Sequence, residues 1–520
     1  MTSFLPTEFP LTAFPLTALA PLVLLAAALP FAVHPGRRPG RLPELAEAAG
    51  LASLLLVLGG LGQLLTSGPA EGLALVRLNA ISVTLALLVA FVGWVVIRYS
   101  RRYLDGEARE GRFHGLVLAA IAAVLLLVQA ASLWVLAASF IATGLILRQL
   151  LLFYPERAEA RRAAAKFIRV WTAGDVALLL AALLLWLSFG TTDIAVLTAA
   201  TSLPAPAVIA VALLVLAAVL KTAALPVHGW LTEVMEAPTP VSALLHAGII
   251  NSGGVLLITL SGLVQTSPGA MAALVLVGGI TALFGALVML TQSAVKTALA
   301  WSTVAQMGFM LLQCGLGLWP LALLHIVAHS LYKAHAFLSS GGAVQAVNAI
   351  RKPGPVAVPN LGAVARSFAL ALVLYVAVAT GFTLLLGEKS PQALALGAML
   401  IFGVSYLIAQ GLADAAPWSL TIRTATASLA ATLAYFGFQV AAKAIWGPWL
   451  PQAPVAGSLE WALIVLAVLS FGLVAFAQAL FPLWAHHPST AGLRVHLANG
   501  LYLNALLDRM IGGFRTSRNA

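Results

Sequence analysis

One stretch of this largely apolar chain, from Lys221 to Gly254, combines ionisable side chains with prolines. This stretch holds a lysine, two histidines and two glutamates, with prolines at Pro226, Pro238 and Pro240. A lysine inside a membrane span costs at least about 2.5 kcal/mol, so it rarely persists without a partner or a role. Proline-broken helices at membrane depth occur only inside protein or beside a polar cavity. The stretch is therefore predicted to form part of an ion pathway.

Asp175 and Lys221 lie in two successive apolar runs and could pair with each other. Burial disfavours a charged lysine and a nearby carboxylate favours it, which is the balance that a proton-transfer group needs. Two plainer alternatives stay open on sequence grounds. Asp175 could cap the start of a helix, and Lys221 could extend its ammonium group from a helix end to the interface.

A second group of polar residues follows in LHIVAHSLYKAHAFL. His325, His329 and Lys333 are spaced at i, i+4 and i+8, so they form one stripe along a helix. We interpret this stripe as a hydrated wire for protons or ions. An HxxxH pair can also bind zinc, but Lys333 would repel a cation, and no metal site is predicted. His335 falls on another face and is a candidate gate or partner contact.

Five more residues complete the candidate set. His246 lies inside the next span, where its imidazole could relay protons or make a structural hydrogen bond. Lys296 begins a later span, and conduction and interfacial exposure are both open for it. His228, Glu233 and Glu236 lie between two spans and are candidates for a gate or a partner contact, although loop carboxylates are often only solvated.

Composition defines the fold class. The chain has 520 residues, a mean hydropathy of +1.00, 61% hydrophobic residues and 9% charged residues, whereas an ordinary globular protein is about 25% charged. We therefore predict an all-α polytopic membrane protein with about 14–15 transmembrane helices. The first run lacks the pattern of a cleaved signal peptide and is expected to be retained. The expected spans are 11–33, 43–66, 74–100, 114–130, 132–153, 170–189, 204–224, 240–262, 268–290, 295–318, 319–345, 360–387, 391–413, 420–446 and 460–484.

The net charge of +11 is distributed unevenly along the chain. Placing the basic loops in the cytoplasm gives an external N-terminus and a cytoplasmic C-terminus, so the charge indicates membrane topology and not nucleic-acid binding. The segment 157–166 is predicted to be a short interfacial helix, and 490–514 a second one on the cytoplasmic face that helps to dock a partner. Cys314 is the only cysteine and is expected to be buried. The basic clusters are 37–41, 98–112, 157–169, 351–352 and 494–518.

The sequence contains no Walker A, CxxC or HExxH pattern. Its motifs resemble instead the proton-conducting antiporter-like family, which includes subunit L of respiratory complex I and the large subunit of Mrp antiporters. KTAALPVHGWLTEVMEAPTPVSALLHAG and the HxxxHxxxK helix carry this resemblance, which covers about 134–346. It implies inverted repeats of five helices with broken helices, and a division of the chain into 1–113, 114–262, 268–413 and 414–520. It also implies that six residues conduct ions: Asp175, Lys221, His246, His325, His329 and Lys333.

Three features of that family have no counterpart here. The glutamate that usually pairs with the lysine falls at about Ile141, which leaves Asp175 as the candidate partner of Lys221. A second central lysine is missing between Leu361 and Leu412, and so is the long lateral C-terminal helix.

One shortened branch of the family resembles the chain more closely, namely the membrane subunits of DAB-type inorganic-carbon accumulation complexes. The stretches LLLFYPERAEARRAAAKF, HAGIINSGG and VHLANGLYLNALLDRMIG carry this resemblance. It implies a non-enzymatic subunit of the bacterial inner membrane that conducts protons or Na⁺ inward. It further implies no cofactor in this chain, and a partner like DabA, a large zinc protein resembling β-carbonic anhydrase. The rival hypotheses are a complex I-like or Mrp antiporter subunit, and a non-conducting membrane anchor for the zinc enzyme.

Overall fold

The computed structural model describes residues 14–72, 75–342, 361–411, 418–480, 484 and 487–510. The predicted basic clusters at 351–352 and beyond residue 510 lie outside these residues. Two compact units are found: one comprises Met1–Ser267, His325–Ser340 and Leu507–Ala520, and the other comprises Pro268–Leu324 and Gly341–Leu506. The four-part division expected from the sequence is a different partition and stays a prediction.

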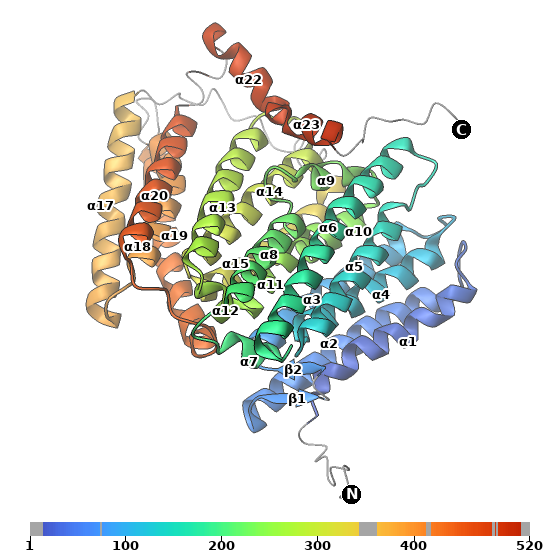
Figure 1. Cartoon of the computed structure of the whole chain (residues 1–520). Helices are drawn as coiled ribbons and strands as arrows, with labels where there is room; N and C mark the ends of the chain where they lie inside the picture. Colours follow the sequence, from blue (N-terminus) through green and yellow to red (C-terminus); the bar gives the residue numbers. More distant parts are fainter. Residues whose placement is uncertain are drawn as a thin grey trace, which may run out of the picture. The chain divides into compact units, whose positions relative to one another are not determined.

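The first unit is built from long helices and one short two-stranded sheet (Figure 1). Local capping sets several of the helix starts. For example, Asn79 accepts hydrogen bonds from the backbone N–H groups of Ile81 and Ser82. The long elements are α1 (Leu19–Val33), α2 (Leu42–Ser67), α3 (Ala80–Tyr103), α4 (Glu110–Gln129), α5 (Leu133–Leu151), α6 (Ala158–Phe189) and α8 (Ala205–Lys221). The shorter ones are η2 (Leu16–Ala18), α7 (Ile194–Thr198) and the antiparallel strands β1 (Ala70–Gly72) and β2 (Val76–Leu78).

The chain after α8 is broken into short helices, as the prolines predicted. These are α9 (Gly229–Thr232), η3 (Val234–Glu236), α10 (Thr239–Ala247), η4 (Ile249–Asn251), α11 (Ser252–Thr259) and α12 (Ser261–Gln265). At the break between α10 and η4, Asn251 Nδ2 donates to the carbonyl of Ala247 at 3.1 Å and to Ser330 Oγ at 2.9 Å. In the span Thr239–Thr259, 94% of the most apolar window is buried, so this irregular backbone lies inside protein.

α6 differs from the expectation of a separate interfacial helix at 157–166. That segment forms the first turns of α6, which runs unbroken for 32 residues. Alanine-rich sequence favours helix, and neither glycine nor proline occurs between Ala158 and Ala173 to end it. Lys166 is buried within this part of the helix. The expectation of a separate short helix is therefore wrong.

The second unit contains the remaining long helices. They are α13 (Pro268–Met289), α14 (Val295–Gly315), α17 (Leu361–Leu386), α18 (Pro391–Gly411), α19 (Trp418–Trp446) and α20 (Ser458–Ala479). α15 (Trp319–Leu338) begins in this unit, and its residues from His325 onward belong to the first. The short elements are η5 (Ser340–Gly342), η6 (Gly447–Trp449), η7 (Pro488–Thr490), α22 (Ala491–Ala498), η8 (Gly500–Tyr502) and α23 (Leu503–Met510).

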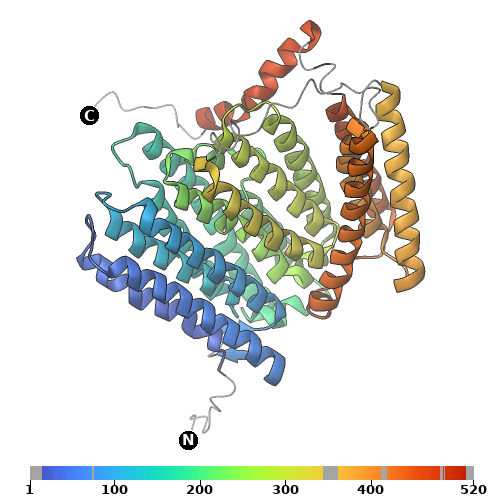
Figure 2. The same ribbon diagram turned by 180° about the vertical axis from the view of Figure 1, so that it is seen from behind.

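The predicted helix over 490–514 is interrupted within its described part. Gly500, Leu501 and Tyr502 all have positive φ, at 59°, 48° and 60°, so the right-handed helix cannot continue through them. Two short helices, α22 and α23, take its place (Figure 2). The side chain of Asp508 on α23 is buried, so this helix does not simply lie on a surface.

α13 and α14 pack with their backbones in close approach. A Cβ atom added at Gly278 would lie 2.5 Å from the backbone nitrogen of Leu312, and one at Gly308 would lie 2.4 Å from that of Ala282. Small residues at such contacts allow two membrane helices to approach closely. Cys314, near the end of α14, is buried as expected.

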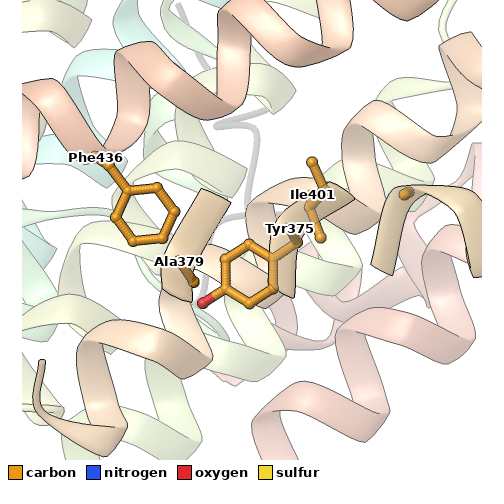
Figure 3. Packing of buried hydrophobic residues seen from close by; sticks show 5 residues of the cluster. Tyr375, Ala379, Ile401 and Phe436 are labelled. Carbon is orange, nitrogen blue, oxygen red and sulfur yellow. The ribbon is translucent and has the colours of Figure 1, made fainter. Parts of the chain in front are cut away.

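α17, α18 and α19 share a small apolar core of their own (Figure 3). The rings of Tyr375 and Phe436 stack with their centroids 5.9 Å apart, and Ala379 and Ile401 fill the space around them. The Tyr375 hydroxyl donates to the carbonyl of Leu394, so its polar end is satisfied inside the core.

Twelve of the described helices are long and apolar enough to cross a membrane. The shorter apolar segments Ala205–Lys221 and Pro391–Gly403, together with α14, occupy the other expected runs. Each of the fifteen runs predicted from hydropathy therefore contains helix. The predicted class, an all-α polytopic membrane protein with broken helices, is confirmed.

Candidate ion-pathway site

Asp175 and Lys221 form a buried ion pair inside the first unit. Lys221 Nζ lies 2.6 Å from Asp175 Oδ1, and the lysine side chain has no exposed surface. Asp175 lies well inside α6, so it does not cap a helix start. Lys221 ends α8, yet its side chain points into protein and not to an interface. The structure thus joins the two residues that the sequence had placed in adjacent spans.

Two aromatic rings complete the surroundings of the Lys221 ammonium group. Its Nζ lies 4.1 Å from the centre of the Trp171 ring and 4.6 Å from that of Phe140. Each cation–π contact of this kind contributes about 2 kcal/mol when water is excluded. Trp171 Nε1 donates to the Phe140 carbonyl at 3.1 Å, which fixes the two rings relative to each other. Gly144 provides the space for Trp171, because a Cβ there would lie 2.2 Å from the indole.

This aromatic enclosure lies where the family resemblance places a missing carboxylate. Phe140 directly precedes Ile141, the position at which the family's glutamate was expected. The charged form of Lys221 is therefore stabilised by one carboxylate and two ring faces. Neither ring was predicted from the sequence, although Trp171 stands one helical turn before Asp175 and so shares its helix face.

The histidine stripe lies on α15 as the spacing predicted. His329 and Lys333 are buried and His325 is half-buried, with the two imidazole centroids 6.0 Å apart. His335 is exposed on a different face of the helix.

His246 on α10 joins this group. Its ring stacks on that of Phe337, with centroids 4.4 Å apart and planes 21° apart. Phe337 belongs to α15, the helix that carries His329 and Lys333. The broken span and the histidine stripe therefore meet within one unit. Lys296 belongs to the other unit, where it is half-buried in the first turn of α14.

The candidate loop residues differ in their surroundings. His228 is buried, and burial, reinforced by the charge of Lys166, lowers its pKa to about 4, so its ring is neutral near pH 7. Glu233 accepts a hydrogen bond from Lys166 Nζ at 2.6 Å, and Glu236 accepts one from Arg157 at 3.0 Å. Both glutamates are thus ion-paired and are not merely solvated.

A further charged group, on α23, was not predicted from the sequence. Asp508 on α23 lies with its Oδ1 2.5 Å from Lys166 Nζ and accepts a hydrogen bond from Arg162 at 2.7 Å through Oδ2. Its sequence signal was weak: a single acid in NALLDRM, far along the chain from any expected partner. Among the described residues, no group of three histidine, cysteine or acidic side chains is arranged to hold a metal ion.

Comparisons with known proteins place this chain in a family. The family model described as "NADH:quinone oxidoreductase/Mrp antiporter, TM" matches residues 130–387. A second model, "NADH-Ubiquinone oxidoreductase (complex I), chain 5 N-terminus", matches residues 74–114. A solved structure of the Mrp complex from Dietzia sp. DQ12-45-1b shares the fold, with a TM-score of 0.63 and 23% identity over 97% of this chain and 60% of that chain. The family models, together with the shared fold, thus define the class as an antiporter-like membrane subunit.

Curated relatives agree with this class. The "Probable inorganic carbon transporter subunit DabB2" of Halothiobacillus neapolitanus is 36% identical over 84% of this chain and 79% of its own length. DabB of Hydrogenovibrio crunogenus is 45% identical over 52% of this chain and 53% of its own. NADH-quinone oxidoreductase subunit L of Mycobacterium tuberculosis is 35% identical over 55% of this chain and 46% of its own. The chain belongs to the antiporter-like family of multi-pass membrane subunits that includes DabB proteins and subunit L.

Proposed function

We propose that this chain is the ion-conducting membrane subunit of an inorganic-carbon uptake complex. The observation that best supports ion conduction is the buried Asp175–Lys221 pair. A buried ionisable pair in a membrane helix is costly and is rarely retained without a role. The role in inorganic-carbon uptake is supported by the similarity to proteins named as probable inorganic carbon transporter subunits.

In this proposal, the chain moves protons or Na⁺ inward, down their gradient. Lys221 alternates between a charged form, held by Asp175 and the two rings, and a neutral form that burial favours. The histidines of α10 and α15 hold and pass the proton, and Lys333 adds a positive charge to the stripe on α15. The proposed pathway residues are Asp175, Lys221, His246, Lys296, His325, His329 and Lys333.

The chemistry of CO2 hydration is assigned to a partner and not to this chain. We propose a DabA-like zinc protein, resembling β-carbonic anhydrase, whose one-way hydration of CO2 is driven by the ion flow. The complex would lie in the bacterial inner membrane, with the N-terminus of this subunit in the periplasm and its C-terminus in the cytoplasm, as the basic loops indicate.

Purification of the tagged chain from its native membrane tests the proposed complex. We expect one large partner to be recovered with it, and stoichiometric zinc in the same sample. Recovery of quinone-reductase or Mrp subunits without a zinc protein would instead assign the chain to a redox-linked pump or an antiporter. Carbon uptake that persists after an uncoupler has collapsed the gradient would identify it as a non-conducting anchor.

A further inference from the structure

α6 carries a second buried ionic cluster, separate from the Asp175–Lys221 pair. Lys166 Nζ contacts both Glu233 Oε1, at 2.6 Å, and Asp508 Oδ1, at 2.5 Å. Arg162 binds the other oxygen of Asp508 at 2.7 Å and lies 3.9 Å from Glu233. We refer to Arg162, Lys166, Glu233 and Asp508 as the α6 cluster. With all four groups ionised, its two positive and two negative charges cancel.

The members of the α6 cluster differ sharply in their access to solvent. The side chains of Lys166 and Asp508 are 3% and 1% exposed, whereas that of Glu233 is 22% exposed. Arg162 is also exposed, but a guanidinium group keeps its proton at any physiological pH. Glu233 is therefore the member that both reaches solvent and can exchange a proton.

Buried aromatic rings extend from the Asp175–Lys221 pair along α6 toward Lys166. Trp171, which faces Lys221, packs against Trp230 with ring centroids 6.3 Å apart, and Trp230 packs against Phe167 at 5.3 Å. Phe167 directly follows Lys166, and Trp230 stands three residues before Glu233. The aromatic layer thus contacts Lys221 at one end and reaches residues close in sequence to Lys166 and Glu233 at the other.

We propose that Glu233 is the solvent-side proton-exchange group of the pathway, and that Lys166 and Asp508 are positioning residues that hold it and set its local charge. This inference rests on the proposed ion conduction. In the step itself, a proton from water binds a Glu233 carboxylate oxygen, which releases its contact with Lys166, and Asp508 then remains to neutralise the lysine. The reverse transfer restores the Glu233–Lys166 pair.

The charges around Glu233 determine how proton uptake depends on pH. From α6 it faces Lys166 and Arg162, and from α23 Asp508 reaches it through the same lysine. Within its own loop, His228 is acted on by Lys166, and Glu236 pairs with Arg157. Removing the Asp508 charge leaves the cluster with an excess positive charge, which disfavours the protonated carboxyl. Removing the Arg162 charge has the opposite effect.

Two charge variants of opposite sign test the proposal in the full chain with its native partners, reconstituted in liposomes that hold a pH-sensitive dye. We expect Asp508→Asn to move the pH of half-maximal proton flux down by about half to one unit, and Arg162→Gln to move it up by a similar amount. Glu233→Gln should reduce the flux at least about tenfold. Asp105→Asn, in an exposed pair with Arg38, removes the same charge elsewhere and should leave the profile unchanged.

The outcomes separate this inference from the proposed function. If Asp508→Asn and Arg162→Gln both reduce the amount of folded protein and neither shifts the pH profile, the α6 cluster only anchors α23. If Glu233→Gln retains full flux while Lys221→Met loses it, the exchange role of Glu233 is wrong and conduction stands. Flux that survives Lys221→Met overturns the proposed function itself.

Discussion

Replacing Lys221 by methionine is expected to reduce ion flux at least about tenfold, to the level of liposomes without protein. The ammonium group is the only part of this side chain that can carry a proton, and methionine fills a similar volume without it. The neighbouring rings of Trp171 and Phe140 can accept methionine, since sulfur packs well against aromatic faces. Flux is measured with the reconstituted, full-length chain and its partners.

Stability measurements on the same pair distinguish a conducting role from a structural one. Removal of one member of a buried ion pair typically costs about 3–5 kcal/mol, whereas apolar replacement of both members is often neutral. We therefore expect Asp175→Leu to lower the free energy of unfolding by about 3 kcal/mol, and the double variant with Lys221→Met to recover most of that loss. Flux should stay absent in the double variant. If flux returned together with stability, the pair would be a structural element only.

Replacing Gly278 by leucine should prevent the close packing of α13 on α14. The new Cβ would lie 2.5 Å from a backbone nitrogen of α14, and backbone atoms cannot move aside as a flexible side chain can. Overpacking of this kind costs about 1–3 kcal/mol where neighbours can adjust, and we expect the upper end here. The readout is the thermal midpoint of the purified protein in detergent.

Gly279, the residue next to Gly278, provides a matched control for the Gly278→Leu substitution. An added Cβ at Gly279 has no neighbour within 4 Å, so Gly279→Leu brings the same side chain and the same helix propensity without the clash. Its thermal midpoint should stay close to that of the unmodified protein. Equal losses in both variants would show that the close helix approach is not what stabilises this unit.

The sequence predicted the spans and the polar stripe because both depend on local properties. A run of about 20 apolar residues is long enough to cross the bilayer whatever it packs against. The spacing of His325, His329 and Lys333 places them on one face of any regular helix, and α15 has that form. The Asp175–Lys221 contact could also be predicted, because a nearby carboxylate stabilises a buried lysine and few carboxylates lie in the spans.

The α6 cluster could not be predicted in the same way. Lys166 lies in a basic, alanine-rich segment whose composition suits an interfacial helix and a buried helix equally well. Its partner Asp508 is 342 residues further along the chain, and no local pattern specifies so distant a contact. Three successive left-handed residues before α23 also have no strong signal, since only Gly500 among them favours that conformation.

The continuous course of α6 has an electrical consequence. Lys166 and Asp175 are nine residues apart, which is about 14 Å along a helix, or roughly half of a hydrocarbon layer of about 30 Å. An elementary charge that crosses the whole layer gains about 2.3 kcal/mol per 100 mV, so in the proposed pathway, with α6 along the membrane normal, a proton that moves between the two ionic groups would gain about 1 kcal/mol at 100 mV. Membrane voltage would therefore drive this step even where the pH on both sides is equal.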